Sequence, residues 1–166
     1  MSPDRRARKR SAPSPVPNEV RLGPSSDDGH EIVFFKRHEA DDPHQAEPGR
    51  EALQGWPAKV RIKAFARLAA VAAAPPKRFA GGGYWEAMKA EMTGWFELRV
   101  DGPNRHHYRL FCRLDYGAEG ADKPLLVVVH GRDKPFRTEL SAADYEAVRE
   151  LGDEYFSRNP RSLAVS

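Results

Sequence analysis

The stretch WFELRVDGPNRHHYRLFCRLDY, residues 95–116, decides the fold that the sequence predicts. Two of its segments, WFELRV (95–100) and HYRLFCRLDY (107–116), place apolar side chains at every second position. Because successive side chains of a strand point to opposite faces, this alternation is typical of strands. The segment DGPNR (101–105) between them is rich in turn-forming residues, so the two strands are predicted to form an antiparallel hairpin.

Two further segments have the composition of strands. EIVFFKRH (31–38) is rich in β-branched and aromatic residues. LLVVV (125–129) is a continuous apolar run, which is typical of a central strand that is buried on both faces. The sheet is therefore predicted to contain about four strands.

Helices are predicted on both sides of the hairpin in the chain. The segment 57–74 (PAKVRIKAFARLAAVAAA) has apolar residues at helical spacing, begins with Pro57 in its first turn and is followed by two prolines. The segment 142–156 has a similar apolar face, and Ser141 is suited to cap it. A short helix is predicted over residues 50–55.

The order of these elements predicts the α+β class, with a small, mostly antiparallel sheet and helices packed on one face in a two-layer fold. The basic and proline-rich residues 1–30 are predicted to be a disordered tail. One domain is expected over residues 31–161, and residues 162–166 are expected to be a short tail.

The composition excludes several classes of protein. Cys112 is the only cysteine of the 166 residues, so neither an intrachain disulfide nor a cysteine-rich metal site can form. No metal or cofactor is expected. No apolar stretch is long enough to span a bilayer and no secretory signal is recognisable, which favours a cytoplasmic protein without membrane contact. The net charge of +3 permits a polyanionic partner without requiring one.

Positive charge is concentrated in a few places. Lys59, Lys63 and Arg67 follow one another at helical spacing, and no acidic residue occurs between Trp56 and Trp85. Such a stripe can hold an RNA backbone by charge, although a solvated helix face is the ordinary alternative. The cluster RRARKR (5–10) could contact nucleic acid, but a solvated tail is the favoured interpretation because basic clusters in tails are common.

Arginines also share a face of the predicted hairpin. Arg99 lies beside Glu97 on one strand, and Arg109 and Arg113 are expected opposite them. Two arginines on one sheet face are typical of an anion site, because the guanidinium group binds two phosphate oxygens at once. The alternative is that the arginines pair with Glu97 and Asp115 on a solvated face.

The run WFELRV, then YRLF, then LLVVVHGRDK with a helix after it, resembles the RelE/ParE superfamily of toxins from type II toxin–antitoxin systems, and most closely the HigB-like branch. The resemblance implies a RelE-like fold and a metal-independent endoribonuclease that cleaves mRNA, free or on the ribosome. It also implies a neutralising antitoxin partner with a helix-turn-helix. Two alternatives stay open, namely a non-catalytic relative that binds RNA or a protein, and a ParE-like gyrase poison.

The resemblance also assigns roles to residues. Arg99 and Arg109 match the arginines of the family's "ELR" and "YR" strands, which implies phosphate binding and transition-state stabilisation. Lys134 matches the lysine of the loop after the last strand, and His130 at the end of that strand is a candidate acid or base. Arg113 and Arg137 complete the predicted RNA-binding set, which also includes Lys59, Lys63 and Arg67.

The sequence departs from the family where a second lysine is usual, because Pro135 follows Lys134. No dedicated general base is evident. Glu97 is a possible substitute, but it would first have to lose its arginine partners. The pair His106 and His107 lacks the further ligands of a metal site.

Overall fold

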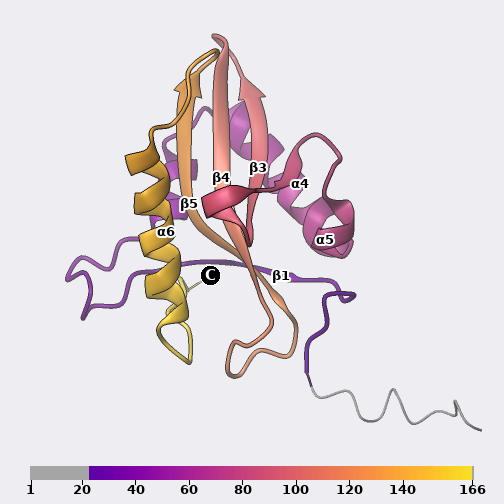
Figure 1. The fold of residues 1–166 in the computed structure, drawn as a ribbon, viewed down its shortest axis with the longest axis vertical. Coiled ribbons are helices and arrows are strands. Elements are labelled where there is room, and N and C mark those ends of the chain that lie inside the picture. The colour runs from indigo at the N-terminus through magenta and orange to yellow at the C-terminus, as the bar shows by residue number, and fades with distance from the viewer. Residues whose placement is uncertain (1–22, 166) are drawn as a thin grey trace, which may run out of the picture.

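The computed structural model describes residues 23–165, which fold around one five-stranded sheet (Figure 1). The strand order is β1-β5-β4-β3-β2. The strands are β1 (Glu31–Phe34), β2 (Trp85–Ala87), β3 (Trp95–Gly102), β4 (His106–Asp115) and β5 (Leu125–Pro135). Only the pairing of β1 with β5 is parallel within this part of the chain, so the predicted α+β class and mostly antiparallel sheet are confirmed.

The three predicted helices are present in the predicted order, and a further short helix, α5 (Pro76–Phe79), was not predicted. The predicted helices are α3 (Pro48–Gln54), α4 (Ala58–Ala73) and α6 (Ala142–Phe156), and a 3-10 turn lies at Ala90–Met92. At the start of α6, the Ser141 hydroxyl accepts from the Asp144 backbone N–H (3.1 Å) and the Asp144 carboxylate accepts from the Ser141 N–H (2.8 Å). This capping box satisfies two backbone donors that the helix leaves unpaired. No helix within residues 23–165 has both the length and the apolar character needed to cross a bilayer.

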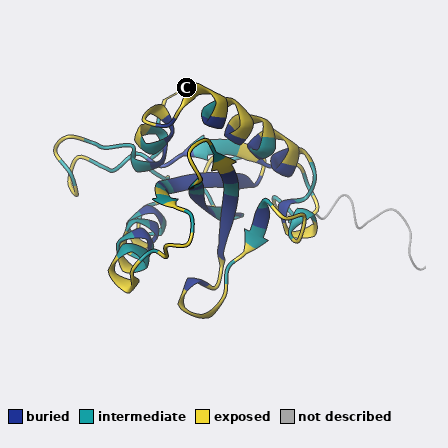
Figure 2. Cartoon of the chain, turned by 90° about the horizontal axis from the view of Figure 1, so that it is seen from above, coloured by how far each residue is buried: buried dark blue, intermediate teal, exposed yellow. Residues whose placement is uncertain are grey.

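Helices cover both faces of the sheet, which corrects the expectation that they lie on one face. Val60, Ala64 and Leu68 of α4 pack on one face, here called the α4 face. Val148 and Tyr155 of α6 pack on the other, the α6 face. In Figure 2 the helices flank the sheet on two sides and turn their buried residues toward it. The reason is that the central strands are apolar on both faces and each face must be shielded from water.

The hairpin of β3 and β4 forms as predicted, but its register differs in part. Arg99 lies opposite Arg109, whereas Arg113 lies opposite Trp95 and therefore not next to Glu97. The fifth strand, β2, was not predicted, because three residues are too few to show alternation.

The last strand is longer than predicted. It continues through Pro135, so Lys134 belongs to a strand and not to the loop that the resemblance implies. A bulge between Phe111 and Cys112 shifts the pairing of β4 with β5 by one residue. A bulge of this kind re-aims the side chains that follow it.

Most of the predicted N-terminal tail, residues 1–22 with the cluster 5–10, lies outside the described residues. Residues 23–30 form turns, and His30 is buried with its Nε2 atom 3.1 Å from the Tyr116 hydroxyl. At the other end, Leu163 forms an antiparallel bridge with Phe35, so this part of the predicted tail packs against the sheet.

Gly152 brings α6 close to the sheet and provides a test of this packing. A Cβ atom at position 152 would lie 2.8 Å from Cη2 of Trp95, which is itself buried. We expect Gly152→Ala to lower the free energy of unfolding by about 1–3 kcal/mol through overpacking, partly offset by the better helix propensity of alanine. Urea unfolding measures the loss. Gly82→Ala is the control, because its Cβ would meet nothing closer than 3.5 Å. Equal stability of the two variants would contradict the packing.

Candidate functional site

Three arginines lie side by side across the middle of the sheet. Arg99 of β3 is the register partner of Arg109 of β4, and Arg109 is the partner of Arg132 of β5. Because directly opposite residues of antiparallel strands share a face, these side chains form one transverse row, here called the arginine row. Like charges directly opposite each other destabilise a sheet. The row therefore suggests a use for concentrated positive charge.

Carboxylates neutralise part of the arginine row. The Glu97 Oε1 atom accepts a hydrogen bond from Arg99 Nε at 2.6 Å and lies 3.5 Å from Arg109 Nε. Asp144 of α6 lies 3.1 Å from Arg132. Glu97 is only 7 % exposed, so its charge acts on the arginines through little water. An incoming anion must compete with Glu97 for the two guanidinium groups.

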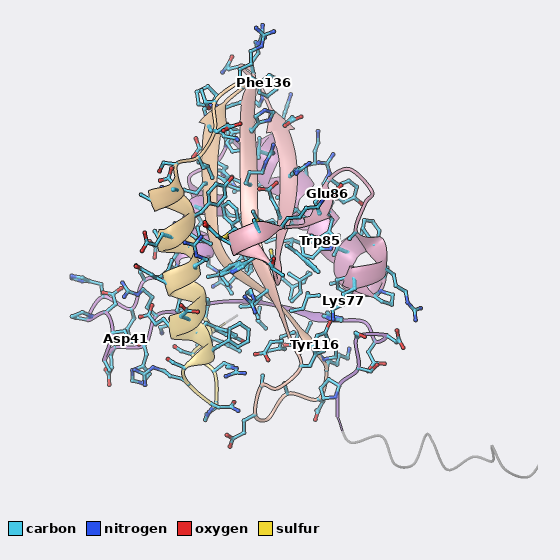
Figure 3. All side chains as sticks on the ribbon, viewed as in Figure 1. Asp41, Lys77, Trp85, Glu86, Tyr116 and Phe136 are labelled. Carbon is cyan, nitrogen blue, oxygen red and sulfur yellow. The ribbon has the colours of Figure 1, made fainter. Side chains whose placement is uncertain are left out.

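Two members of the arginine row, Arg99 and Arg109, line an open hollow of about 640 Å³ on the α6 face, here called the main hollow, whereas Arg132 lines a different pocket. Its cationic lining residues are Lys89, Arg99, Arg109 and Lys134. Its acidic lining residues are Glu86, Glu97 and Glu139. The predicted shared hollow of Arg99 and Arg109 is therefore present, but its charge is mixed. In Figure 3, Glu86 lies at the edge of the sheet that borders this hollow.

Two smaller hollows continue from the main hollow around the edge of β3. The first, of about 340 Å³, shares Arg99 and Arg109 with the main hollow and adds Arg67. The second, of about 240 Å³, is lined by Lys59 and Lys63. The two smaller hollows share Asp101, and the first of them shares Arg99 and Arg109 with the main hollow. Cationic side chains thus line all three hollows, from Lys59 and Lys63 of α4 to the arginine row.

Arg67 reaches the site from α4, on the other face of the sheet. Its guanidinium group donates to the Arg99 carbonyl at 2.6 Å and lies 4.5 Å from the centre of the Tyr84 ring. The register of β2 with β3 ends at Leu98, and the last backbone contact between the two segments is the Arg99 N–H to the Tyr84 carbonyl (2.8 Å). Sequence spacing predicts the helical stripe that contains Arg67, but only the tertiary fold places it beside Arg99.

The arginine row has a neighbouring row of residues on each side. Toward the hairpin turn, the next row on the same face consists of Asp101, His107 and Lys134. Away from the turn, it consists of Glu97, Phe111 and His130. Phe136 lies at the hairpin end of the sheet in Figure 3.

Tyr145 of α6 closes the main hollow on the helix side. Its ring meets that of Phe111 edge to face, with 6.1 Å between ring centres. Burial, helped by the charge of Glu97, raises the pKa of the Tyr145 hydroxyl, so this group is protonated at neutral pH and can donate a hydrogen bond. Burial also lowers the pKa of Arg109, against the opposing effect of Glu97. Arginine nevertheless keeps its charge in proteins.

Three of the predicted site residues lie away from the hollows. His130 lines a separate pocket between α3 and α6, and burial together with the charge of Arg132 lowers its pKa. Arg113 is held over the rings of Trp95 (5.3 Å) and Phe156 (4.8 Å). Arg137 is exposed in the turn after β5 with a φ of 64°.

Arg132 and Tyr145 are site residues that the sequence reasoning missed. His130, Arg132 and Lys134 occupy every second position of the sequence. If the predicted strand had been extended beyond residue 129, this spacing would have placed the three side chains on one face. Tyr145 was interpreted only as part of the apolar face of the last helix. Nothing local distinguishes it from Tyr155, which is fully buried at the other end of α6.

Within residues 23–165, no group of three or more His, Cys, Asp or Glu side chains is arranged to hold a metal ion. Cys112 is buried, and burial raises the pKa of its thiol far above neutrality. An activated thiolate is therefore not part of the site.

No protein-family model, curated protein or solved structure matches this chain.

Proposed function

We propose that the protein is the toxin of a type II toxin–antitoxin pair and acts in the cytoplasm as an endoribonuclease on mRNA. The arginine row beside the main hollow is the observation that carries this proposal. Three guanidinium groups in one row of the sheet, two of which line a hollow together with Lys134 and Tyr145, suit the binding of a phosphodiester. The adjoining hollows with Arg67, Lys59 and Lys63 provide a path for a single strand.

The proposed reaction uses the 2′-hydroxyl of the RNA itself. The 2′-oxygen forms a bond to phosphorus and gives up its proton, while the bond from phosphorus to the 5′-oxygen breaks and that oxygen takes a proton. The products are a 2′,3′-cyclic phosphate and a 5′-hydroxyl end. Arg99 and Arg109 stabilise the charge that develops on the phosphate oxygens, and Lys134 lies within reach of the same hollow.

Cleavage of RNA by the purified protein in the presence of EDTA tests the proposal. We expect 2′,3′-cyclic phosphate ends, and growth arrest when the protein is expressed in bacteria. Intact RNA together with normal growth would contradict the proposal. DNA damage signalling without loss of RNA would instead favour a gyrase poison.

A neutralising partner protein is part of the same proposal, and the outer face of α4 supports it. Ile62 (70 % exposed) and Phe65 (48 % exposed) leave apolar surface in water next to Lys59 and Lys63. An antitoxin segment with apolar and acidic side chains would complement this face.

A non-catalytic protein that binds RNA is the second candidate. The pairing of Glu97 with both Arg99 and Arg109 favours it, because a carboxylate that occupies these groups weakens their hold on a transition state. Binding of RNA without cleavage would support this alternative.

Removal of the Glu97 charge is expected to strengthen RNA binding. At about 4 Å, the repulsion between this carboxylate and a phosphate is about 1 kcal/mol even in water, so we expect Glu97→Gln to lower the Kd roughly fivefold. Fluorescence anisotropy with an RNA that carries 2′-deoxy substitutions measures binding without cleavage. Glu119→Gln, at the opposite end of the sheet, is the control. Weaker binding by Glu97→Gln would mean that Glu97 is needed to hold the arginines in place.

A further inference from the structure

Two histidine–aspartate pairs stand next to each other at the hairpin end of the sheet. His107 Nδ1 lies 2.6 Å from Asp101 Oδ1, and His106 Nε2 lies 2.7 Å from Asp133 Oδ2. The two pairs lie on opposite faces. The ring of His106 packs against Tyr108, which belongs to the core of the α4 face, whereas His107 lies on the α6 face beside the arginine row.

We infer that His107 is the proton-transfer group of the site and that Asp101 is the residue that positions it. This inference rests on the proposed ribonuclease function. His107 is two residues from Arg109 on the same face of β4, and its register partners are Asp101 on β3 and Lys134 on β5. Residues two apart on a strand lie about 6.6 Å apart. A phosphate on the arginine row is therefore a near neighbour of the imidazole.

The geometry of the pair determines which nitrogen of His107 can react. A carboxylate only accepts hydrogen bonds, so the Nδ1 atom that faces Asp101 carries the hydrogen. In the neutral ring, the Nε2 atom then has a free lone pair. Within residues 23–165, no hydrogen bond engages this Nε2 atom, and the side chain remains 23 % exposed. His107 is thus set up to accept a proton, as an oriented imidazole does in other hydrolytic enzymes.

One face of the His107 ring also packs against another aromatic side chain. It stacks on Phe136 with 4.2 Å between ring centres and 25° between planes. The backbone of Phe136 is held by its N–H, which donates to the Arg105 carbonyl at 2.8 Å. The charged groups that face His107 are Asp101, Lys134 and Arg109, whose Nη1 atom lies 3.9 Å from the same Asp101 oxygen. Contacts on two sides orient the imidazole and leave Nε2 free.

On the opposite side of the arginine row stands Tyr145, whose hydroxyl is protonated at neutral pH. A phosphate on the row would therefore lie between an acceptor and a donor of protons. His107 Nε2 takes the proton of the 2′-hydroxyl as the 2′-oxygen bonds to phosphorus. The bond from phosphorus to the 5′-oxygen breaks, and this oxygen takes the proton of the Tyr145 hydroxyl, so the proton that His107 gains is matched by the one that Tyr145 gives up.

The experiment compares His107→Asn with His106→Asn in RNA cleavage under single-turnover conditions. We expect His107→Asn to lose about 10²-fold in rate, which is the contribution of one proton-transfer group. His106→Asn removes an equivalent histidine–aspartate pair from the other face and should keep the wild-type rate. Added imidazole should restore part of the rate to His107→Gly and leave His106→Gly unchanged. Asp101→Asn should alter the pH profile of the rate, which a purely structural role would not do.

A second substrate distinguishes a base from an acid. An RNA with sulfur in place of the bridging 5′-oxygen has a leaving group that needs no proton. His107→Asn should remain slow on this substrate, and recovery of the wild-type rate would overturn the assignment of His107 as the base. If the wild-type protein cleaves RNA and His107→Asn is equally active, this inference fails and the proposed function stands. If the wild-type protein cleaves neither RNA nor the sulfur substrate, both fail.

Discussion

Arg109→Ala is expected to lose about 10²- to 10³-fold in the rate of RNA cleavage, which corresponds to about 2.7–4 kcal/mol of transition-state stabilisation. Arg109 is the central member of the arginine row, and its side chain is only 12 % exposed. A charge in such a poorly hydrated position acts strongly on a neighbouring phosphorane. Neither Arg99 nor Arg132 can replace it, because Glu97 holds Arg99 at 2.6 Å, closer than it lies to Arg109 at 3.5 Å, and Asp144 holds Arg132 at 3.1 Å.

Arg109→Lys is expected to recover little of this loss. An ammonium group supplies the charge but not the planar pair of donors that matches two phosphate oxygens. Single-turnover cleavage measured on gels gives the rates, and circular dichroism verifies folding. Arg109→Gln serves as a second variant, since it keeps a hydrogen bond to Glu97 possible. Arg158→Ala is the control, because Arg158 pairs with Asp41 outside the hollows. Folded Arg109 variants with the wild-type rate would refute the role of the arginine row.

The second large effect is expected on stability. Asp115 at the end of β4 is buried and accepts hydrogen bonds from Tyr155 (2.7 Å), Arg161 (2.8 Å) and the Gly117 N–H (2.9 Å). These contacts attach the end of α6 and the segment after it to the sheet. Asp115→Ala leaves the Arg161 charge, only 11 % exposed, without its partner. Breaking a buried pair of this kind costs about 3–5 kcal/mol of unfolding free energy.

The pair formed by Asp41 and Arg158 provides a matched control for Asp115. It has the same chemistry and a similar distance of 3.1 Å, but both side chains are about one third exposed. Water screens such a pair, so Asp41→Ala should cost less than about 1 kcal/mol. Urea unfolding of both variants measures the difference. Equal losses would mean that burial does not set the strength of the Asp115 cluster.

The same cluster predicts how stability depends on pH. Burial by itself would raise the pKa of Asp115, but the hydrogen bonds from Arg161, Tyr155 and Gly117 outweigh it and lower the pKa below its ordinary value. The stabilisation is therefore fully present above the unfolded pKa of about 3.9 and is lost as the pH falls through the lower folded pKa. Acid unfolding of the wild type should show this loss. Asp115→Asn, which cannot titrate, should show a shallower dependence below about pH 4.

Local patterns in the sequence were enough to predict most of the elements. Alternation over residues 95–100 and 107–116 predicted β3 and β4, and prolines marked both ends of α4. These signals are local, because the period of side chains along a strand or helix is set by the backbone itself. For the same reason Arg99 and Arg109 could be placed on one face in advance.

Local sequence patterns could not predict how the strands pair with one another. The position of Arg132 in the arginine row depends on the length of β5 and on the bulge at Phe111 and Cys112. Both depend on how two apolar faces pack against helices that are distant in the chain. The expectation of helices on one face failed for the same reason, since a sheet that is apolar on both sides must be covered twice.

The sequence by itself therefore determined the α+β class, the order of the elements and the arginines that share a strand face. Only the tertiary structure decided that Arg132 joins the arginine row, that Tyr145 of α6 lines the hollow of Arg99 and Arg109, and that Glu97 lies between two guanidinium groups. Periodicity is a property of neighbouring residues, whereas a site is assembled from contacts between distant segments. Those contacts are chosen by the burial of apolar surface and by the pairing of charges over the whole domain.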